Sequence, residues 1–339
     1  MESVLDRLPQ GSRVAILRLR SLGDCVLTTP ALDILKRARP DLRLAIVVED
    51  RFRAIFEGNP DLDRVLPPDL GALRGWRPQL CINLHGGTRS AWMTALSGAR
   101  YRAGFGHFRH RFVYNVHIPR AQSFLGVDRV VHTAEHLASA MFHLGAPLVE
   151  IPRAKLFTVG RTPRSAADAL VGPLGIGLNV DSIGDGGSGG TRADQGVRPT
   201  MRPYAVLHPF AATAEKAWRS EGFLAVAEHL KQSGLEPTFI GGPIDDLSPF
   251  RAFRTISNPP LSETKRLLSA ASLFVGNDSG PAHMAAAFGL PVVGIFGASD
   301  PAIWGPWRTA SVVVTAPGGI SRIDTAQVLD ALTRLRVHA

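Results

Sequence analysis

Short apolar runs, typical of buried β-strands, alternate along this chain with longer runs in which apolar residues recur at helical spacing. In the first half, strands are expected at 14–19, 42–48 and 80–84, and helices at 29–39, 51–58, 88–97 and 133–144. In the second half, strands are expected at 204–208, 236–240, 273–275 and 292–296, and helices at 220–233, 262–271, 281–288 and 325–336. Strands that alternate with helices predict parallel sheets covered on both faces, so the fold class is α/β.

The alternation is interrupted once, between residues 172 and 202, where the sequence becomes polar and rich in glycine. Residues 183–196 (IGDGGSGGTRADQG) have no hydrophobic period, which is typical of a flexible connection. A chain of 339 residues is long enough for two domains. We therefore expect two Rossmann-like βα domains, 1–175 and 203–339, that face each other across a cleft, with a Gly-rich linker at 176–202.

The composition excludes several classes of protein. Two cysteines, Cys25 and Cys81, cannot build a disulfide framework or a zinc site. No apolar run reaches the ~18 residues that a membrane-spanning helix needs. The first residues lack the apolar segment of a signal peptide. These features predict a cytoplasmic protein without a transmembrane segment.

The net charge of +9 is concentrated in the first half. Residues 1–175 contain 24 Lys and Arg against 15 Asp and Glu, whereas the remaining residues contain 14 of each. No acid occurs between Asp69 and Asp128. The arginines in this window are Arg74, Arg77, Arg89, Arg100, Arg102, Arg109, Arg111 and Arg120. The first half is therefore predicted to face an anionic partner.

The segment after the first expected strand carries an isolated carboxylate. Gly23 is expected to let the backbone turn tightly, and Asp24 follows at the carboxyl end of the strand. Open α/β sheets bind ligands at that edge, which makes Asp24 a candidate functional residue. Asp is also a preferred N-cap, so a purely structural role as a helix cap explains the same residue.

Four polar segments follow strands in the second half, at 208–218, 241–246, 276–283 and 296–301. In the third of them, Pro281 suits the first helical position and Asp278 or Ser279 suits the cap. Gly280 leaves no side chain over the start of the helix. Free N–H groups at that helix end would form an anion site that suits a diphosphate.

Other residues of these segments have both functional and structural interpretations. Lys216 suits a phosphate but is also typical of a solvated surface lysine. His283 can face the ligand or the core. Asp245 is placed to accept hydrogen bonds from ribose hydroxyls, and together with Asp246 it also suits a turn after Gly-Gly-Pro.

Taken together, these segments resemble glycosyltransferase family 9, the heptosyltransferases that add heptoses to the lipopolysaccharide inner core. The resemblance covers 13–66, 80–114 and 204–307. Its motifs are 21–32 (SLGDCVLTTPAL), 216–218 (KAW), 276–283 (GNDSGPAH) and 296–301 (FGASDP). It implies a GT-B fold with the donor in the carboxyl-terminal domain and the acceptor in the amino-terminal one. The reaction implied is inverting and needs no catalytic metal or other cofactor.

The resemblance also assigns roles to individual residues. Asp24 matches the general base, and Lys216 matches the residue that neutralises the departing diphosphate. The donor-binding set implied is Thr213, Lys216, Asp245, Asp278, Ser279, Gly280 and His283. The family often has a Gly where Phe210 stands and hydroxyl residues where Ala211 and Ala212 stand, a loss for which Thr213 can compensate. The 183–196 segment has no counterpart that we can place.

The leading hypothesis is therefore transfer of a heptose from ADP-heptose to a lipopolysaccharide inner-core acceptor. Arg89, Arg109 and Arg111 are predicted to bind this anionic, lipid-linked glycan at the membrane surface, which would make the enzyme peripheral on the inner face of the cytoplasmic membrane. A different nucleotide-sugar donor with a different glycan acceptor is the nearest alternative. A non-catalytic nucleotide- or nucleic-acid-binding protein is weaker, because no such module is recognisable. A Rossmann dehydrogenase is weaker still, because no G-x-G-x-x-G follows the first strand.

Overall fold

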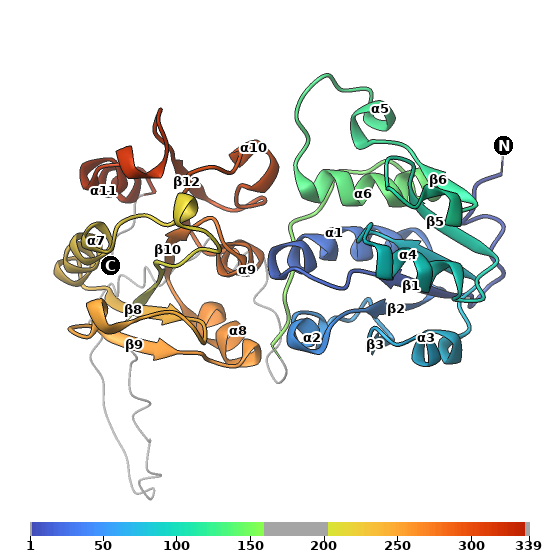
Figure 1. Ribbon diagram of the computed structural model, residues 1–339, viewed down its shortest axis with the longest axis horizontal. Helices are drawn as coiled ribbons and strands as arrows, with labels where there is room; N and C mark the ends of the chain where they lie inside the picture. The colour runs from blue at the N-terminus through green and yellow to red at the C-terminus, as the bar shows by residue number, and fades with distance from the viewer. Residues whose placement is uncertain (1, 159–202, 336–339) are drawn as a thin grey trace, which may run out of the picture.

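The structure, a computed structural model, describes residues 2–158 and 203–335. Each of these two ranges builds one parallel sheet with helices on both faces (Figure 1). The predicted α/β architecture is thereby confirmed. The linker predicted at 176–202, with its Gly-rich 183–196 segment, lies outside the described residues. So do residues 159–175 of the predicted first domain and 336–339 of the predicted second domain.

The first sheet has six parallel strands in the order β3-β2-β1-β4-β5-β6. The strands are β1 (Arg13–Leu17), β2 (Arg43–Val47), β3 (Arg64–Leu66), β4 (Leu80–Asn83), β5 (Tyr101–Phe105) and β6 (Val116–Ile118). The helices are α1 (Leu22–Ala38), α2 (Arg53–Phe56), α3 (Leu70–Trp76), α4 (Thr88–Ala95), α5 (Ala121–Leu125) and α6 (Thr133–Leu144), with 3₁₀ turns η1 (Asp50–Phe52) and η2 (Arg111–Val113).

The second sheet also has six parallel strands, in the order β12-β11-β10-β7-β8-β9. The strands are β7 (Tyr204–His208), β8 (Glu236–Gly241), β9 (Arg254–Ser257), β10 (Leu273–Asn277), β11 (Val292–Ile295) and β12 (Ser311–Val314). The helices are α7 (Ser220–Gln232), α8 (Leu261–Ala270), α9 (Gly280–Phe288), α10 (Pro301–Trp304) and α11 (Thr325–Arg334), with 3₁₀ turns η3 (Ala214–Lys216), η4 (Ser248–Phe250) and η5 (Ile320–Arg322).

The two sheets share one strand order, that of the doubly wound Rossmann fold. In each sheet the chain starts in the middle, builds outward for three strands, and then returns to build the other side. The strand order reverses between β1 and β4 in the first sheet and between β7 and β10 in the second. Ligands of such sheets bind at the carboxyl ends of the strands at this reversal.

Helix α1 begins at Leu22, not at residue 29 as the sequence pattern predicted. The Thr28-Thr29-Pro30 run is unfavourable inside a helix because proline cannot donate to the carbonyl four residues earlier, that of Val26. Here the Thr29 hydroxyl donates to the Val26 carbonyl at 2.8 Å and replaces the missing bond. The early start places Asp24 inside the first turn of the helix.

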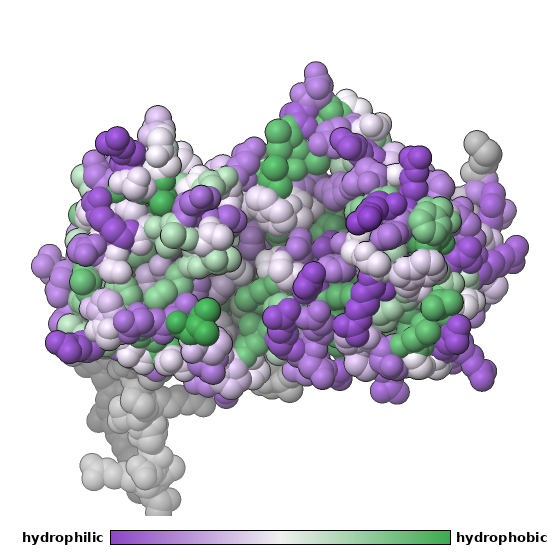
Figure 2. Space-filling view, in the orientation of Figure 1, coloured by the Kyte–Doolittle hydropathy of each residue, from purple (hydrophilic) through white to green (hydrophobic). Residues whose placement is uncertain are grey.

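The two domains pack directly on each other. One buried apolar cluster joins side chains of α1 and α6 to side chains of α8 and α9, and α1 lies next to α9 in Figure 1. Polar contacts cross the same boundary. Lys265 on α8 donates to the carbonyls of Ala54 (2.5 Å) and Glu57 (3.2 Å), and His132 Nε2 lies 2.9 Å from the Gly305 carbonyl. The surface is hollowed between the two lobes (Figure 2).

Candidate active site

Asp24 lies in the first turn of α1, directly after the central strand β1. Ser21 is the N-cap residue, and its hydroxyl donates to Asp24 Oδ2 at 2.9 Å. The carboxylate accepts no backbone N–H of the helix among the described residues, so the interpretation of Asp24 as a helix cap is wrong. The Asp24 side chain is 22% exposed. A carboxylate that is held in place yet reachable suits proton transfer.

Arg18 is a buried cation beside this carboxylate. Its side chain is only 7% exposed, and its Nη1 lies 3.6 Å from Asp24 Oδ1. Burial lowers the pKa of the Arg18 guanidinium, and the Asp24 charge opposes that shift. Arg18 Nε has no hydrogen-bond partner among the described residues. A buried charge with unused donors is costly, so Arg18 is suited to receive an anionic group.

Two histidines extend the polar surface around Arg18. His136 stacks on Phe105 with ring centroids 4.0 Å apart, and the His107 ring lies 5.5 Å from that of His136. Burial lowers the pKa of His136 to about 4, and the charges of His107 and Arg18 act in the same direction. His136 is therefore a neutral imidazole at neutral pH.

The second domain contributes the start of α9. Ser279 is the N-cap residue, one of the two alternatives predicted. Gly280 takes the first helical position, so the prediction of Pro281 there is wrong by one residue. The hydroxyl oxygen of Ser279 and Nδ1 of His283 are buried without a hydrogen-bond partner among the described residues. Burial lowers the pKa of His283 to about 4. Unpartnered polar atoms beside the positive end of a helix are suited to bind an anion.

Lys216 reaches the same loop from η3. Its Nζ lies 3.0 Å from Asp278 Oδ2, so Lys216 is not a free surface lysine. Asn277 fixes both flanks of the Lys216 loop, because its amide donates to the Pro209 carbonyl at 2.8 Å and its oxygen accepts the Trp218 N–H at 3.1 Å. Trp218 is buried and anchors the end of this loop. The ion pair therefore holds Lys216 against the loop that carries Asp278, which is a candidate donor-binding loop.

Two glycines bring the helix ends of the two domains together. A Cβ atom on Gly23 would lie 2.6 Å from His283 Cδ2, and one on Gly280 would lie 2.5 Å from Leu22 Cδ2. Gly23 lies inside α1 without a positive φ, so the tight turn predicted for it is wrong. The structural role of both glycines is close approach. The approach places Asp24, Asp278 and Lys216 within electrostatic range of His283.

The remaining donor candidates lie near this edge of the sheet. Asp245 accepts the Gly242 N–H at 2.7 Å and Asp246 accepts the Ser248 N–H at 2.9 Å, so both stabilise the turn after β8. Thr213 is exposed at the start of η3.

Sequence reasoning missed two further candidates at the same edge. His208 Nδ1 and Ser299 Oγ are buried and unpartnered among the described residues. Their positions at or just after the ends of β7 and β11 were the only signal in the sequence.

Of the arginines in the acid-free window, Arg120 lies near this group, because its charge adds to burial in lowering the pKa of His107 and of His136. None of the eight forms an ion pair with a described residue. Arg89, Arg109 and Arg111 are exposed, and Arg89 donates to the Pro68 carbonyl at 2.6 Å. These three arginines therefore pair with no acid of the described fold, and their charge is available to a binding partner.

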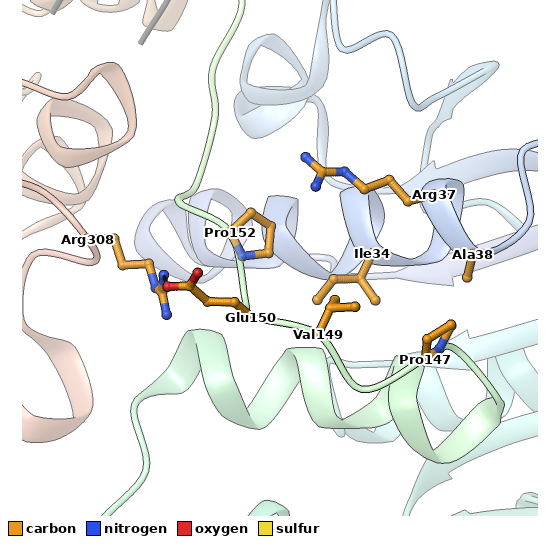
Figure 3. Close-up of a pocket in the computed structure, with 8 residues that line it drawn as sticks. All are labelled: Ile34, Arg37, Ala38, Pro147, Val149, Glu150, Pro152 and Arg308. Carbon is orange, nitrogen blue, oxygen red and sulfur yellow. Dashed lines mark hydrogen bonds and ion pairs between the residues drawn. The ribbon is translucent and has the colours of Figure 1, made fainter. Parts of the chain in front are cut away.

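A separate hollow of about 470 Å³ lies along the carboxyl-terminal half of α1 (Figure 3). Ile34, Val149 and Pro152 line it with apolar surface. The charged residues around it are already paired, Arg308 with Glu150 and Arg37 with Asp33. The hollow therefore offers no unused polar group for chemistry.

Within 2–158 and 203–335, no three His, Cys, Asp or Glu side chains are grouped so as to hold a metal ion. No helix in these ranges has the length and hydrophobicity needed to cross a membrane.

Two Rossmann-like domains that meet at the carboxyl ends of their central strands, with Asp24 on one side and Lys216 on the other, have the architecture of GT-B glycosyltransferases. The model of glycosyltransferase family 9 (heptosyltransferase) matches residues 71–322, and the chain belongs to this family.

Curated relatives and solved structures are similar over most of the chain. Lipopolysaccharide heptosyltransferase 3 of Escherichia coli K12 is 26% identical over 92% of this chain and 90% of its own. Lipopolysaccharide heptosyltransferase 1 of Pseudomonas aeruginosa is 27% identical over 88% of this chain and 82% of its own. Among structures, the family 9 glycosyltransferase of Veillonella parvula has a TM-score of 0.75 at 20% identity, covering 96% of this chain and 97% of that one. The E. coli heptosyltransferase WaaC with ADP has a TM-score of 0.70 at 20% identity, covering 95% and 99%. At these identities the structural likeness establishes the GT-B fold.

Proposed function

We propose that this glycosyltransferase moves a heptose from ADP-heptose to an inner-core sugar of lipopolysaccharide, with inversion at the anomeric carbon and without a catalytic metal. The observation that carries the proposal is the meeting of the two helix ends, because it sets Asp24 of one domain opposite the donor loop of the other. Solved relatives at this fold include WaaC complexes with ADP and with ADP-2-deoxy-2-fluoro heptose.

The chemistry follows from the two sides of the site. An acceptor hydroxyl oxygen attacks the anomeric carbon and gives its proton to Asp24. The bond from that carbon to the diphosphate oxygen breaks, and ADP leaves with the bonding electrons. Lys216 and the N–H groups at the start of α9 neutralise the charge that grows on the diphosphate. Ser279 and His283 supply polar atoms that are unused in the structure as it stands.

Thr213 and Asp245 are proposed to complete the donor site, with Asp245 accepting hydrogen bonds from the ribose. Asp245 already accepts the Gly242 N–H through Oδ2, which orients the carboxylate and leaves Oδ1 for a ligand. Asp278 orients Lys216 through their ion pair.

The acceptor is proposed to bind on the first domain through its anionic groups. Arg18 offers a buried, unused Nε–H near Asp24, and Arg89, Arg109 and Arg111 offer exposed charge without acidic partners among the described residues. Carboxylates or phosphates of a lipid-linked glycan have the complementary charge. An enzyme acting on such an acceptor works at the inner face of the cytoplasmic membrane.

A different nucleotide-sugar donor is favoured by one observation. Phe210 stands where the family often has glycine, and it packs edge-on against Phe250 with centroids 6.3 Å apart. A Cβ atom on Gly241, at the end of β8, would lie 2.9 Å from the Phe210 ring. Phe210 thus narrows the space beside Asp245.

Release of nucleoside diphosphate from a panel of ADP-, UDP- and GDP-sugars, with and without purified inner-core acceptor, tests the proposal. Acceptor-dependent ADP release from ADP-heptose, unchanged by EDTA, is the expected result. Turnover of another nucleotide-sugar in place of ADP-heptose would establish the alternative donor.

A further inference from the structure

Large apolar side chains are exposed in the acid-free window of the first domain. The described residues leave seven large hydrophobic side chains exposed, and the two aromatic ones, Trp92 (49%) and Phe112 (69%), both lie in this window. Leu96 (45%) is also in the window and lies one turn beyond Trp92. Single exposed apolar residues are ordinary, but adjacent ones are characteristic of an interaction surface.

These three side chains form one surface, which we call the aromatic surface (Trp92, Leu96 and Phe112). The Trp92 and Phe112 rings meet edge to face with centroids 6.3 Å apart. The His110 ring lies 6.0 Å from that of Phe112, and His110 Nε2 lies 3.0 Å from the Thr88 hydroxyl. The contact between α4 and η2 is therefore fixed, and the aromatic surface is a formed feature of the fold.

Unpaired positive charge surrounds the aromatic surface. Arg74 donates to the Leu96 carbonyl at 2.7 Å, Arg89 lies one turn before Trp92 on α4, and Arg111 precedes Phe112. None of these arginines has an acidic partner among the described residues. Hydrophilic and hydrophobic side chains adjoin each other over the α4 region of the first domain (Figure 2).

We propose that the aromatic surface inserts into the interfacial layer of an anionic bilayer. Trp rings prefer this layer because their bodies are apolar and their N–H groups are polar, and arginines beside them meet lipid phosphates. This proposal names the surface that holds the enzyme at the membrane, and it depends on no catalytic step.

The position of the aromatic surface fits a lipid-linked acceptor. The loop from β4 to α4 carries His85, whose pKa is lowered first by burial and also by the charges of Arg18 and Arg20, with Asp24 opposing the shift. Helix α4 begins three residues later at Thr88. Helix α4 runs from that edge of the first sheet, which also holds Asp24, back toward the start of β5, so a single helix joins the acceptor side to Trp92 and Leu96 in its later turns.

Co-sedimentation with phosphatidylcholine vesicles, with and without phosphatidylglycerol, tests the proposal. The wild-type chain should bind the anionic vesicles, and Trp92→Ala/Phe112→Ala should bind at least about tenfold more weakly, because two side chains lose their burial in lipid. Leu148→Ala/Val149→Ala is the matched control, since Leu148 (71%) and Val149 are similarly exposed but lie outside the arginine window. The control should bind like wild type.

A second measurement does not depend on a double variant that could misfold. Brominated acyl chains should quench part of the tryptophan fluorescence, and Trp92→Phe should remove that quenching while the chain still binds vesicles. Turnover of a water-soluble acceptor sugar should be unchanged by Trp92→Ala/Phe112→Ala, which separates this proposal from the proposed function. Absence of vesicle binding, unchanged binding by the double variant, or an equal loss in the control would overturn it.

Discussion

The two sides of the active site share a strand order but differ in how they carry polarity. On the first-domain side, Arg18 lies 3.6 Å from Asp24, whereas Arg89, Arg109 and Arg111 are exposed and carry full charges without an acidic partner among the described residues. On the second-domain side, the cation Lys216 is already paired with Asp278, and the unused groups are neutral: Ser279, His283 and the N–H groups of α9. One architecture therefore offers an anion two kinds of polar surface, exposed charge on the first domain and fixed dipoles on the second.

The resemblance between the sides extends to the residues that hold their loops. Asn83 ends β4 and Asn277 ends β10, and both are buried. The Asn83 amide donates to the Tyr114 hydroxyl at 2.9 Å, and its oxygen accepts the His85 N–H at 2.9 Å. Asn277 makes the equivalent kind of bridge between Pro209 and Trp218. The loops are thus equally fixed, and the difference between the sides lies in the charged groups they present.

The largest expected effect is at Asp24, the proposed general base. Asp24→Asn should lower kcat by about 10²–10⁴-fold, because the amide cannot accept the acceptor proton. Isothermal titration with ADP should give an unchanged Kd, since Asp24 belongs to the acceptor side. Ser21→Ala, which removes only the hydroxyl bonded to Asp24, is the matched control and should cost far less. Retention of more than half of the wild-type turnover by Asp24→Asn would mean that Asp24 is not the base.

The next effect concerns the diphosphate. Lys216→Ala should lower kcat by about 10²–10³-fold and also weaken donor binding, because the charge on the diphosphate grows as its bond to the sugar breaks. Steady-state kinetics and ADP titration measure both effects. Glu215→Ala, an exposed neighbour in the same turn, should leave them unchanged. If Lys216→Ala changed only the melting temperature and neither kcat nor ADP binding, Lys216 would have a structural role alone, as the ion-pair partner of Asp278.

Arg18 tests whether the buried cation of the first domain serves the acceptor. Arg18→Met retains most of the buried volume and should raise the acceptor KM about tenfold or more, because a charge-assisted hydrogen bond is lost. The donor KM should not move. Arg13→Met, at the opposite end of β1 and stacked on Trp76, is the control. Equal changes in both KM values would contradict a role confined to the acceptor side.

Lys265 tests how much its hydrogen bonds across the domain contact contribute to stability. Lys265→Met leaves the carbonyls of Ala54 and Glu57 without their donor and should lower the free energy of unfolding by about 1–3 kcal/mol. Exposed Lys231→Met is the control in the same denaturant titration.

The pH dependence of this effect has a definite sign. Burial lowers the pKa of Lys265 from 10.5 to about 8, so the unfolded chain binds more protons between these values. Wild-type stability relative to Lys265→Met should therefore rise as pH rises from 8 to 10.5. A constant difference across that range would mean that Lys265 is as well solvated as in the unfolded chain.

The sequence pattern predicted β1, β2, β4, β7, β8, β10 and β11 but missed the interior strand β5, and the roles predicted for the site residues stay predictions. Strand β7 and helix α6 have the predicted bounds because their apolar periods are complete. The pattern predicted the start of α1 too late in the sequence. The Thr29 hydroxyl replaces the hydrogen bond that Pro30 cannot make, and hydrophobic periodicity does not reveal such a contact. Edge strands β3 and β6 are short and only partly buried, so they left too weak a signal. The roles of Gly23 and Gly280 depend on the other domain and were not readable locally.

The smallest effect is also the one that compares the two sides directly. Interactions between exposed charges are screened over ~8 Å at physiological ionic strength. Arg109 and Arg111 are exposed and unpaired among the described residues, whereas the donor side relies on partly buried dipoles. The acceptor KM should therefore rise several-fold with added salt, while the donor KM moves little.

Charge reversal at both sites, Arg109→Glu/Arg111→Glu, should raise the acceptor KM in low salt and remove most of its salt dependence. Stability should stay within about 0.5 kcal/mol of wild type, as is usual for surface substitutions. Equal salt sensitivity of the two KM values would mean that the unpaired arginines serve something other than the acceptor. The contrast between exposed charge and fixed dipoles would then no longer explain how the enzyme distinguishes its two anionic substrates.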